Sequence, residues 1–343
     1  MKKIISFLNT DIKIINSYFL FTIVLIILVC VGYSSYALFS FTKTSTNVIE
    51  GTVGDLSKSG TDTLIKLTDN KDNSGLYTIT HEADNTLQIG NDKDITEYRY
   101  RGKDPKNYVT FNNEVWRIIG IFPTDDGTGN IENRIKLIRN EIVVYKYWSS
   151  STSTYNNWTG ATLKIELNGT YLSSLSSEAQ GMIGDTKYYL GGYNGWVRGQ
   201  GITQTPVQMY SYERKISGSS YYYGTNPNSW TGKIALMYVS DYGYASDVCE
   251  SKMLRSSTSS ANDLRACNTT NWLYKGATEW LLPQIASNIL KVFIVDTSGG
   301  GGGVDDASIN NSEYGARPVL YLTSSAKITG GTGTSTDPYT LGL

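Results

Sequence analysis

The chain has 343 residues, with 30 basic and 31 acidic side chains and a formal net charge of −1. Because the positive charges form no stripe, the sequence argues against nucleic acid as a partner. Glycine (34) and tyrosine (26) are abundant whereas proline (7) and histidine (1) are scarce, which indicates an exported, β-rich surface protein. Past an N-terminal apolar segment, about 300 residues remain, enough for one large or two small domains.

The range 14–42 contains no charged side chain, and its centre, 19–31, is almost purely apolar. A helix of about 20 apolar residues crosses the hydrocarbon core of a bilayer. It also satisfies its own backbone hydrogen bonds there. We therefore predict that 14–42 contacts the membrane as a single transmembrane helix, within an N-terminal unit of cytoplasmic stub and anchor over 1–40.

Three lysines precede this segment: Lys2, Lys3 and Lys13. Positive flanks stay cytoplasmic, so we predict a single-pass cell-membrane protein whose C-terminal part is extracellular. A signal peptide cleaved after Ala37 is an alternative, but the apolar run is longer than the roughly 7 to 15 residues of a signal core. A pilin-like helix is a third interpretation, and it lacks the acidic residue that pilins carry early in that helix.

Two of the three cysteines, Cys249 and Cys267, fall in the exported part, and Cys30 lies in the apolar segment. An oxidising compartment favours a disulfide between the first two. Closing that loop stabilises the fold by about 3 kcal/mol in the chain-entropy model. A zinc site and a buried free pair are the alternatives, and two cysteines with a distant His81 make a poor zinc ligand set.

The range 41–97 is polar and interrupted by turn residues, which indicates a stalk or lead-in to one globular domain over 98–343. Within it, 69–75 has some likeness to a calcium loop, but Lys71 occupies a ligand position. We expect no metal site and no cofactor, with calcium as the alternative.

The central region has the patterns of an α+β domain with an antiparallel sheet, short helices and long loops. A β-hairpin is predicted between 115–122 and 135–145, because both are rich in β-branched residues and 125–130 has turn chemistry. Further strands are predicted at 233–239, 290–295 and 315–322.

Two short helices are predicted to pack on this sheet. Leu163, Leu167 and Tyr171 are spaced as one helix face, although Asn168–Gly169 weakens its middle. A second helix is predicted over 177–183, with Ser176 as its N-cap.

The range 186–232 is loop-rich and aromatic. Its candidate ligand-binding residues are Tyr221, Tyr222, Tyr223 and Trp230. Exposed tyrosine and tryptophan offer a large rigid contact area at low entropic cost. The alternative is that these rings fill the core of a loop-rich domain.

Five short motifs follow one another along the chain. They are Tyr-Arg-Tyr-Arg-Gly at 98–102, Val-Trp-Arg-Ile-Ile-Gly at 115–120, Ser-Asp-Tyr-Gly-Tyr-Ala at 240–245, Trp-Leu-Leu-Pro at 280–283 and Gly-Ala-Arg-Pro-Val-Leu at 315–320. In this order the chain resembles a group of membrane-anchored surface proteins from gut Firmicutes and mollicute-like bacteria. The resemblance covers about 98–343 and implies no particular activity.

The Trp-Arg start and the Gly-x-Arg-Pro finish also resemble, more distantly, the C-type-lectin-like domains of formylglycine-generating enzymes and retroelement-diversified binding proteins. That resemblance implies a binding face made of loops, near 296–313. The residues it singles out are Asp305, Asp306, Asn310 and Asn311. The catalytic cysteines of those enzymes have no counterpart here, and a fold does not fix a function.

Three functions remain in competition. The first is a surface adhesion or ligand-binding module that recognises a carbohydrate or a host or envelope protein. The second is a cell-envelope glycan hydrolase with two carboxylates, which one sequence does not exclude. The third is a structural, pilin-like envelope subunit. We favour the first, because no catalytic motif is present and we interpret His81 as a solvated loop residue rather than a catalytic base.

Overall fold

A computed structural model describes residues 59–69, 75–150, 155–194, 204–254, 261–297, 303–310 and 313–343. The expected membrane segment, 14–42, and the alternative cleavage site after Ala37 lie outside these ranges. Among the helices within them, none is long and apolar enough to cross a bilayer. The chain is a mixed, sheet-rich structure with short helices, as the sequence predicts.

The predicted hairpin is the centre of the main sheet. Strand β4 (Glu114–Asp125) pairs antiparallel with β5 (Ile131–Arg139), and the register places Asp125 opposite Ile131. The Asp125 carboxylate accepts the backbone N–H groups of Gly127 and Gly129, which closes the turn. Both glycines have positive φ, the conformation in which a side chain is costly.

The remaining strands extend the hairpin on both sides. Within the described residues the main sheet has the order β15-β16-β3-β4-β5-β14-β9, and β1 joins through β2, which also pairs with β4. The bounds are β1 (Leu76–His81), β2 (Ile95–Tyr100), β3 (Tyr108–Phe111), β9 (Ile234–Ala235), β14 (Val319–Tyr321), β15 (Lys327–Gly330) and β16 (Tyr339–Gly342).

A second sheet has the order β12-β11-β10-β13-β6, and β7 pairs with β8 in a separate ribbon. Most pairs are antiparallel, but β10 with β13 and β16 with β3 are parallel. The bounds are β6 (Val144–Lys146), β7 (Thr186–Tyr189), β8 (Ser229–Gly232), β10 (Glu279–Gln284), β11 (Lys291–Asp296), β12 (Gly303–Ser308) and β13 (Tyr314–Ala316).

The predicted strand over 315–322 is wrong in one respect, because it is two strands in different sheets. Gly315 pairs with Tyr145 in the second sheet, whereas Val319 pairs with Ile138 in the main sheet. The break falls at Arg317–Pro318. Proline has no N–H to donate to a ladder, and the buried Arg317 guanidinium bonds the Glu279 carboxylate at 2.6 Å instead.

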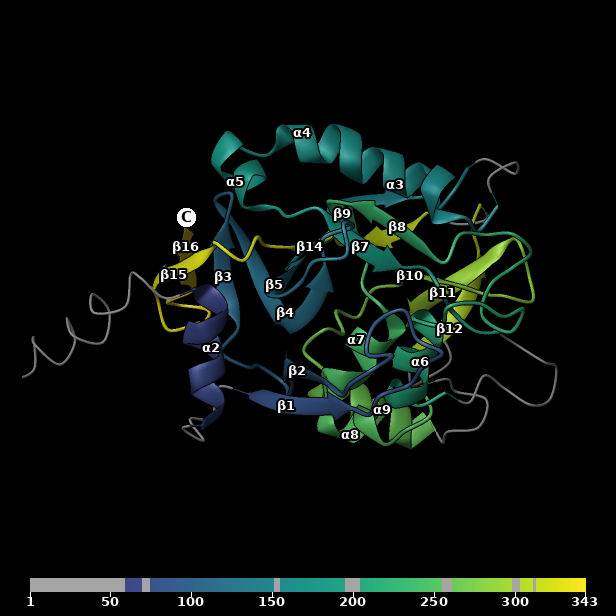
Figure 1. The fold of residues 1–343 in the computed structure, drawn as a ribbon, viewed down its shortest axis with the longest axis horizontal. Helices are drawn as coiled ribbons and strands as arrows, with labels where there is room; N and C mark the ends of the chain where they lie inside the picture. The colour runs from purple at the N-terminus through teal and green to yellow at the C-terminus, as the bar shows by residue number, and fades with distance from the viewer. Residues whose placement is uncertain are drawn as a thin grey trace, which may run out of the picture. The chain divides into compact units, whose positions relative to one another are not determined.

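The short helices are α2 (Gly60–Asp69), η1 (Trp158–Gly160), α3 (Thr162–Glu166), η2 (Leu167–Tyr171), α4 (Leu172–Ser174), α5 (Ser177–Met182), α6 (Pro206–Glu213), α7 (Val239–Tyr244), α8 (Asp247–Glu250) and α9 (Ala261–Thr270). The Ser176 side chain caps α5, as predicted. Around Asn168–Gly169 the predicted helix widens into the π-helical turn η2. Figure 1 shows α6 to α9 gathered near β1 and β2, while α3 and α4 run along the other end of the main sheet.

The predicted strand over 233–239 is also shorter than expected. Only Ile234–Ala235 is a strand, and helix α7 begins at Val239. The Asp241 carboxylate accepts the Tyr238 N–H at 2.9 Å, so it satisfies a backbone donor at the start of α7. This turn into a helix carries Asp241 to the buried charges described below.

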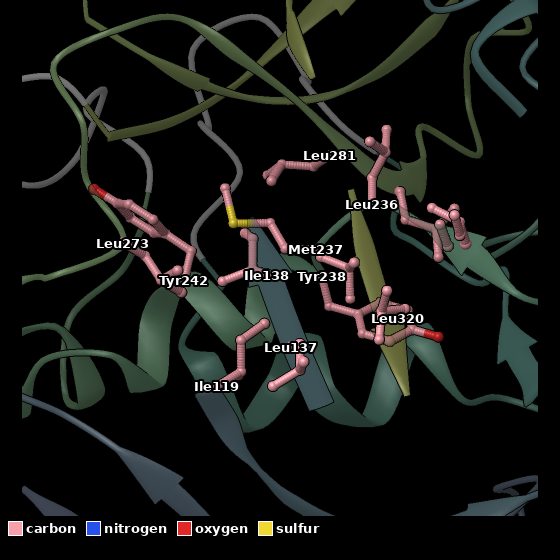
Figure 2. Packing of buried hydrophobic residues seen from close by; sticks show 14 of the residues in the cluster. Ile119, Leu137, Ile138, Leu236, Met237, Tyr238, Tyr242, Leu273, Leu281 and Leu320 are labelled. Atoms are coloured by element: carbon pink, nitrogen blue, oxygen red, sulfur yellow. The ribbon is translucent and has the colours of Figure 1, made fainter. Parts of the chain in front are cut away.

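The hydrophobic core lies between the sheets and the helices that cover them. Figure 2 shows ten labelled side chains gathered in one packed region. They come from β4, β5, β10, β14, α7 and the connecting segments: Ile119, Leu137, Ile138, Leu236, Met237, Tyr238, Tyr242, Leu273, Leu281 and Leu320. Contacts between elements far apart in sequence therefore hold the sheets together.

The described part of the predicted lead-in contributes structure to this fold. Strand β1 of this range pairs with β2, with Thr78 opposite Tyr98, and the Gly60 N–H donates to Ala326 O. These residues belong to one unit that runs from Ser57 to Leu343. The predicted disulfide is confirmed: it joins Cys249 in α8 to Cys267 in α9, with 4.9 Å between their Cα atoms.

Candidate functional site

A surface cleft of about 1010 Å³ opens where the end of β1 meets helix α6. Residues Val207, Tyr210 and Ser211 line it from α6, and their spacing of three and four places them on one helix face. The helix is fixed at its start by a capping box between Thr205 and Gln208. We call this the His81 cleft. The rest of its lining is Ile79, Thr80, His81, Glu82, Ala83, Asp84, Asn85, Leu87, Asn91, Tyr244 and Glu250.

His81 lies at the floor of this cleft. It ends β1 opposite Ile95, and its side chain is 7% exposed. The imidazole stacks on Tyr210 with 3.5 Å between ring centroids and 3° between planes, and Tyr244 meets it edge-on at 6.1 Å. The expectation of a solvated loop residue is therefore wrong, because cross-strand pairing and two aromatic neighbours hold the ring inside.

The orientation of the imidazole is set by Glu97, whose Oε2 lies 3.3 Å from His81 Nε2. Burial raises the pKa of the Glu97 carboxyl, but Arg99 and His81 outweigh that effect and bring the pKa below its ordinary value. An ionised carboxylate only accepts hydrogen bonds, so Nε2 carries the hydrogen in the neutral ring. Nδ1 is then the acceptor, and the structure gives it no partner among the described residues.

Behind Glu97 runs a chain of buried charges. Arg99 bonds Glu97 at 2.8 Å and Asp241 at 3.1 Å, and Lys136 reaches the other Asp241 oxygen at 2.5 Å. Burial lowers the pKa of Lys136 to about 8 despite the nearby Asp241 carboxylate. Each charge has an opposite partner, which is the condition under which buried charges are tolerated.

A second branch joins this network through α6. Glu213 accepts the N–H and the hydroxyl of Ser240 at 2.9 and 2.5 Å, and it pairs with Arg214 at 3.1 Å. Burial raises the pKa of Glu213 to about 7. The Arg214 guanidinium lies 3.7 Å from the centre of the Tyr210 ring. Tyr210 is thus held by both His81 and Arg214, which makes the floor of the cleft rigid.

The lining of the His81 cleft is acidic. Asp84 is paired with Lys215 and Glu250 with Arg101, each at 3.1 Å, and neither cation lines the cleft. Glu82 is exposed and has no ion pair among the described residues. The described lining contains three carboxylates and no lysine or arginine. Hydroxyl and amide groups from the remaining side chains add donors and acceptors.

The aromatic candidates from the sequence lie elsewhere. Tyr222 is 5% exposed, and its hydroxyl donates to Lys215 O. Tyr221 is half-buried against Tyr212, with 5.1 Å between centroids. The Tyr223 N–H donates to Gln284 Oε1 at 2.9 Å. None of the three lines the His81 cleft.

Trp230 and the acidic candidates are also separate from the cleft. Trp230 lies in β8 and stacks on Tyr188 at 5.7 Å. Part of the expected loop 296–313 is strand β12, which carries Asp305 and Asp306. The Asp306 side chain is 2% exposed and bonds Lys291 Nζ at 2.5 Å.

Of the remaining two candidates, Asn310 lies in the turn after β12, and Asn311 lies outside the described residues. In the described ranges, no three histidine, cysteine or acidic side chains lie close enough together to hold a metal ion.

Sequence reasoning missed the His81 site, although one signal was present. Glu97 and Arg99 alternate with Tyr98 in a strand pattern, which places two opposite charges on one face of the sheet. Their partners Asp241 and Lys136 are distant in the chain.

No protein-family model, curated protein or solved structure matches this chain.

Proposed function

We propose that this chain is a membrane-anchored surface protein that binds a carbohydrate in the His81 cleft. The cleft itself carries the proposal: at about 1010 Å³ it is at the upper end of the range of ligand sites. Its walls mix hydroxyl, amide and carboxylate groups with apolar side chains from Ile79, Leu87 and Val207. A sugar ring offers the same mixture, with hydroxyl groups on its edge and C–H groups on its faces.

The location at the cell surface is part of the same proposal. The charge-free run 14–42 and the lysines before it support an anchor with the folded unit outside the cell. The disulfide between Cys249 and Cys267 supports an oxidising compartment. The motif order from 98–102 to 315–320 supports membership of the anchored surface group, and the Trp-Arg start and Gly-x-Arg-Pro finish support a C-type-lectin-like domain.

The test is glycan binding by the full chain in lipid nanodiscs. We expect saturable binding to some members of a panel of neutral, amino and acidic oligosaccharides. Val207→Trp fills the cleft wall, so it should weaken binding at least tenfold. Val115→Trp is the matched control, because Val115 is similarly exposed (47% against 54% for Val207) but lies on β4 outside the cleft. Equal loss in both variants, or no binding to any glycan, would reject the proposal.

A second candidate function is glycan hydrolysis, which the acidic lining favours. Glu82, Asp84 and Glu250 line one cleft, and glycoside hydrolases use a pair of carboxylic side chains. Mass spectrometry of the bound oligosaccharides after incubation separates the two functions. Shortened products that disappear in Glu82→Gln and Glu250→Gln would establish hydrolysis, whereas intact ligand would leave binding alone.

A further inference from the structure

The His81 cleft offers a ligand more acceptors than donors. Its three carboxylates, Glu82, Asp84 and Glu250, only accept hydrogen bonds when they are ionised. Two of them are balanced by Lys215 and Arg101 outside the lining, and Glu82 has no ion pair in the described part of the chain. The lining therefore carries a negative charge that is not balanced within the cleft.

The floor of the cleft also favours a ligand that brings hydrogen-bond donors, through His81 rather than through the carboxylates. When the His81 ring is neutral, the Glu97 carboxylate places its hydrogen on Nε2, and Nδ1 then presents a lone pair. His81 is more than nine-tenths buried, and its position is fixed by Tyr210. A nitrogen acceptor held rigidly at the floor of a cleft is satisfied by a ligand that brings a donor.

From these two observations we infer that the carbohydrate bound in the His81 cleft carries a positive charge, as a sugar with a free amino group does. The inference rests on the proposed function and narrows its ligand class. An ammonium group supplies hydrogen-bond donors and one positive charge, which match the acceptors and the uncompensated carboxylate. A uronic acid would bring a further carboxylate to an acidic wall, and like charges at a binding surface oppose association.

The experiment compares three oligosaccharides of equal length on the full chain in nanodiscs of neutral lipid. They are a glucosamine tetramer, an N-acetylglucosamine tetramer and a galacturonic acid tetramer. Binding is measured by calorimetry at pH 7.0, where part of the sugar amines is protonated and an ordinary imidazole is mostly neutral, in 50 and 500 mM salt. We expect the amino tetramer to bind at least tenfold more tightly than the acetylated one, and this preference to shrink at high salt.

The substitution Glu82→Gln removes the negative charge of this side chain while keeping its size and shape nearly the same. We expect it to weaken binding of the glucosamine tetramer about tenfold, and to weaken binding of the neutral tetramer less. Glu178→Gln is the matched control, because Glu178 is an exposed side chain on α5 outside the cleft. Unfolding curves of both variants show whether each one is folded.

The outcomes separate this inference from the proposed function. If the acetylated or the acidic tetramer binds as tightly as the amino tetramer, the charge inference is wrong while carbohydrate binding stands. If Glu82→Gln and Glu178→Gln have the same effect, the preference does not come from the cleft. If no tetramer and no glycan of the wider panel binds, both the inference and the proposed function fail.

Discussion

Lys136 Nζ lies 2.5 Å from Asp241 Oδ2, and both side chains are fully buried. Asp241 also bonds Arg99, which bonds Glu97, which in turn bonds His81 at the floor of the cleft. The buried imidazole at the floor of the cleft is thus connected to the centre of the fold by a row of alternating charges. The network orients the imidazole and also makes the stability of the domain depend on each of its members.

Lys136→Met should destabilise the fold strongly. The substitution leaves the Asp241 carboxylate with Arg99 as its remaining cation and one oxygen without its partner, and breaking a buried ion pair costs up to about 3 to 5 kcal/mol. Lys146→Met is the matched control, because its pair with Glu166 is partly exposed and such pairs contribute about 0.2 to 1 kcal/mol. Urea unfolding of both variants gives the free energies. Equal losses would show that the buried pair has no special weight.

Glu213 should make stability fall as the pH rises. Burial raises its pKa from 4.5 to about 7 in the folded chain. Between those values the folded state holds a proton that the unfolded state releases, so the free energy of unfolding decreases with pH, by on the order of 3 kcal/mol. The measured quantity is the difference between the wild type and Glu213→Gln in urea unfolding from pH 4.5 to 8.

Substitution of Ser240 provides a check on the assignment of this pH dependence to Glu213. Its hydroxyl donates to Glu213 Oε2 at 2.5 Å and favours the ionised carboxylate. Ser240→Ala should therefore raise the pKa of Glu213 further and move the inflection to higher pH. A difference between wild type and Glu213→Gln that stays constant across this range would contradict the assignment of the pH dependence to Glu213.

The sequence predicted correctly those elements that depend on neighbouring residues in the chain. The β4–β5 hairpin follows from β-branched runs on both sides of Asp125, and the cap of α5 follows from Ser176. The break at Pro318 was readable in principle, because proline cannot donate to a ladder. The apolar run 319–322 that follows it favoured one continuous strand in the sequence.

The candidate site depended on long-range contacts that no local pattern contains. Arg99 and Asp241 are 142 positions apart in the chain, and Lys136 and Asp241 are 105 apart. His81 alone in a polar range gave no sign that Tyr210 would stack on it. The cluster of tyrosines at 221–223 predicted a ligand-binding surface. In the fold, however, the Tyr222 ring is buried and its hydroxyl donates to the Lys215 carbonyl. Composition identified aromatic side chains but not which of them the fold buries.

The disulfide between Cys249 and Cys267 should contribute about 3 kcal/mol. It joins α8 to α9, and both sulfur-bearing side chains are buried in the core. We expect a reducing agent to lower the unfolding temperature of the wild type but to leave that of the Cys249→Ala, Cys267→Ala double variant unchanged. A wild type insensitive to complete reduction, verified by thiol counting, would show that the bridge adds no stability.

Gly120→Ala should destabilise the main sheet. Strand β4 has a register shift between Ile118 and Gly120, where β2 crosses closely. A Cβ atom built on Gly120 would lie 2.1 Å from Tyr98 O, which is backbone and has no room to move. Overpacking of this kind typically costs about 1 to 3 kcal/mol.

The matched control for Gly120 is Gly181→Ala in α5. Nothing lies within 4 Å of the Cβ that this substitution adds. Alanine is favoured over glycine in a helix by about 0.8 to 1 kcal/mol, so the control should be neutral or stabilising. Urea unfolding of the two variants gives opposite signs if β2 and β4 approach as closely as described. A neutral Gly120→Ala would mean that β2 is not held against β4, and the row of charges from His81 to Asp241, which starts on β1 and β2, would lose its support.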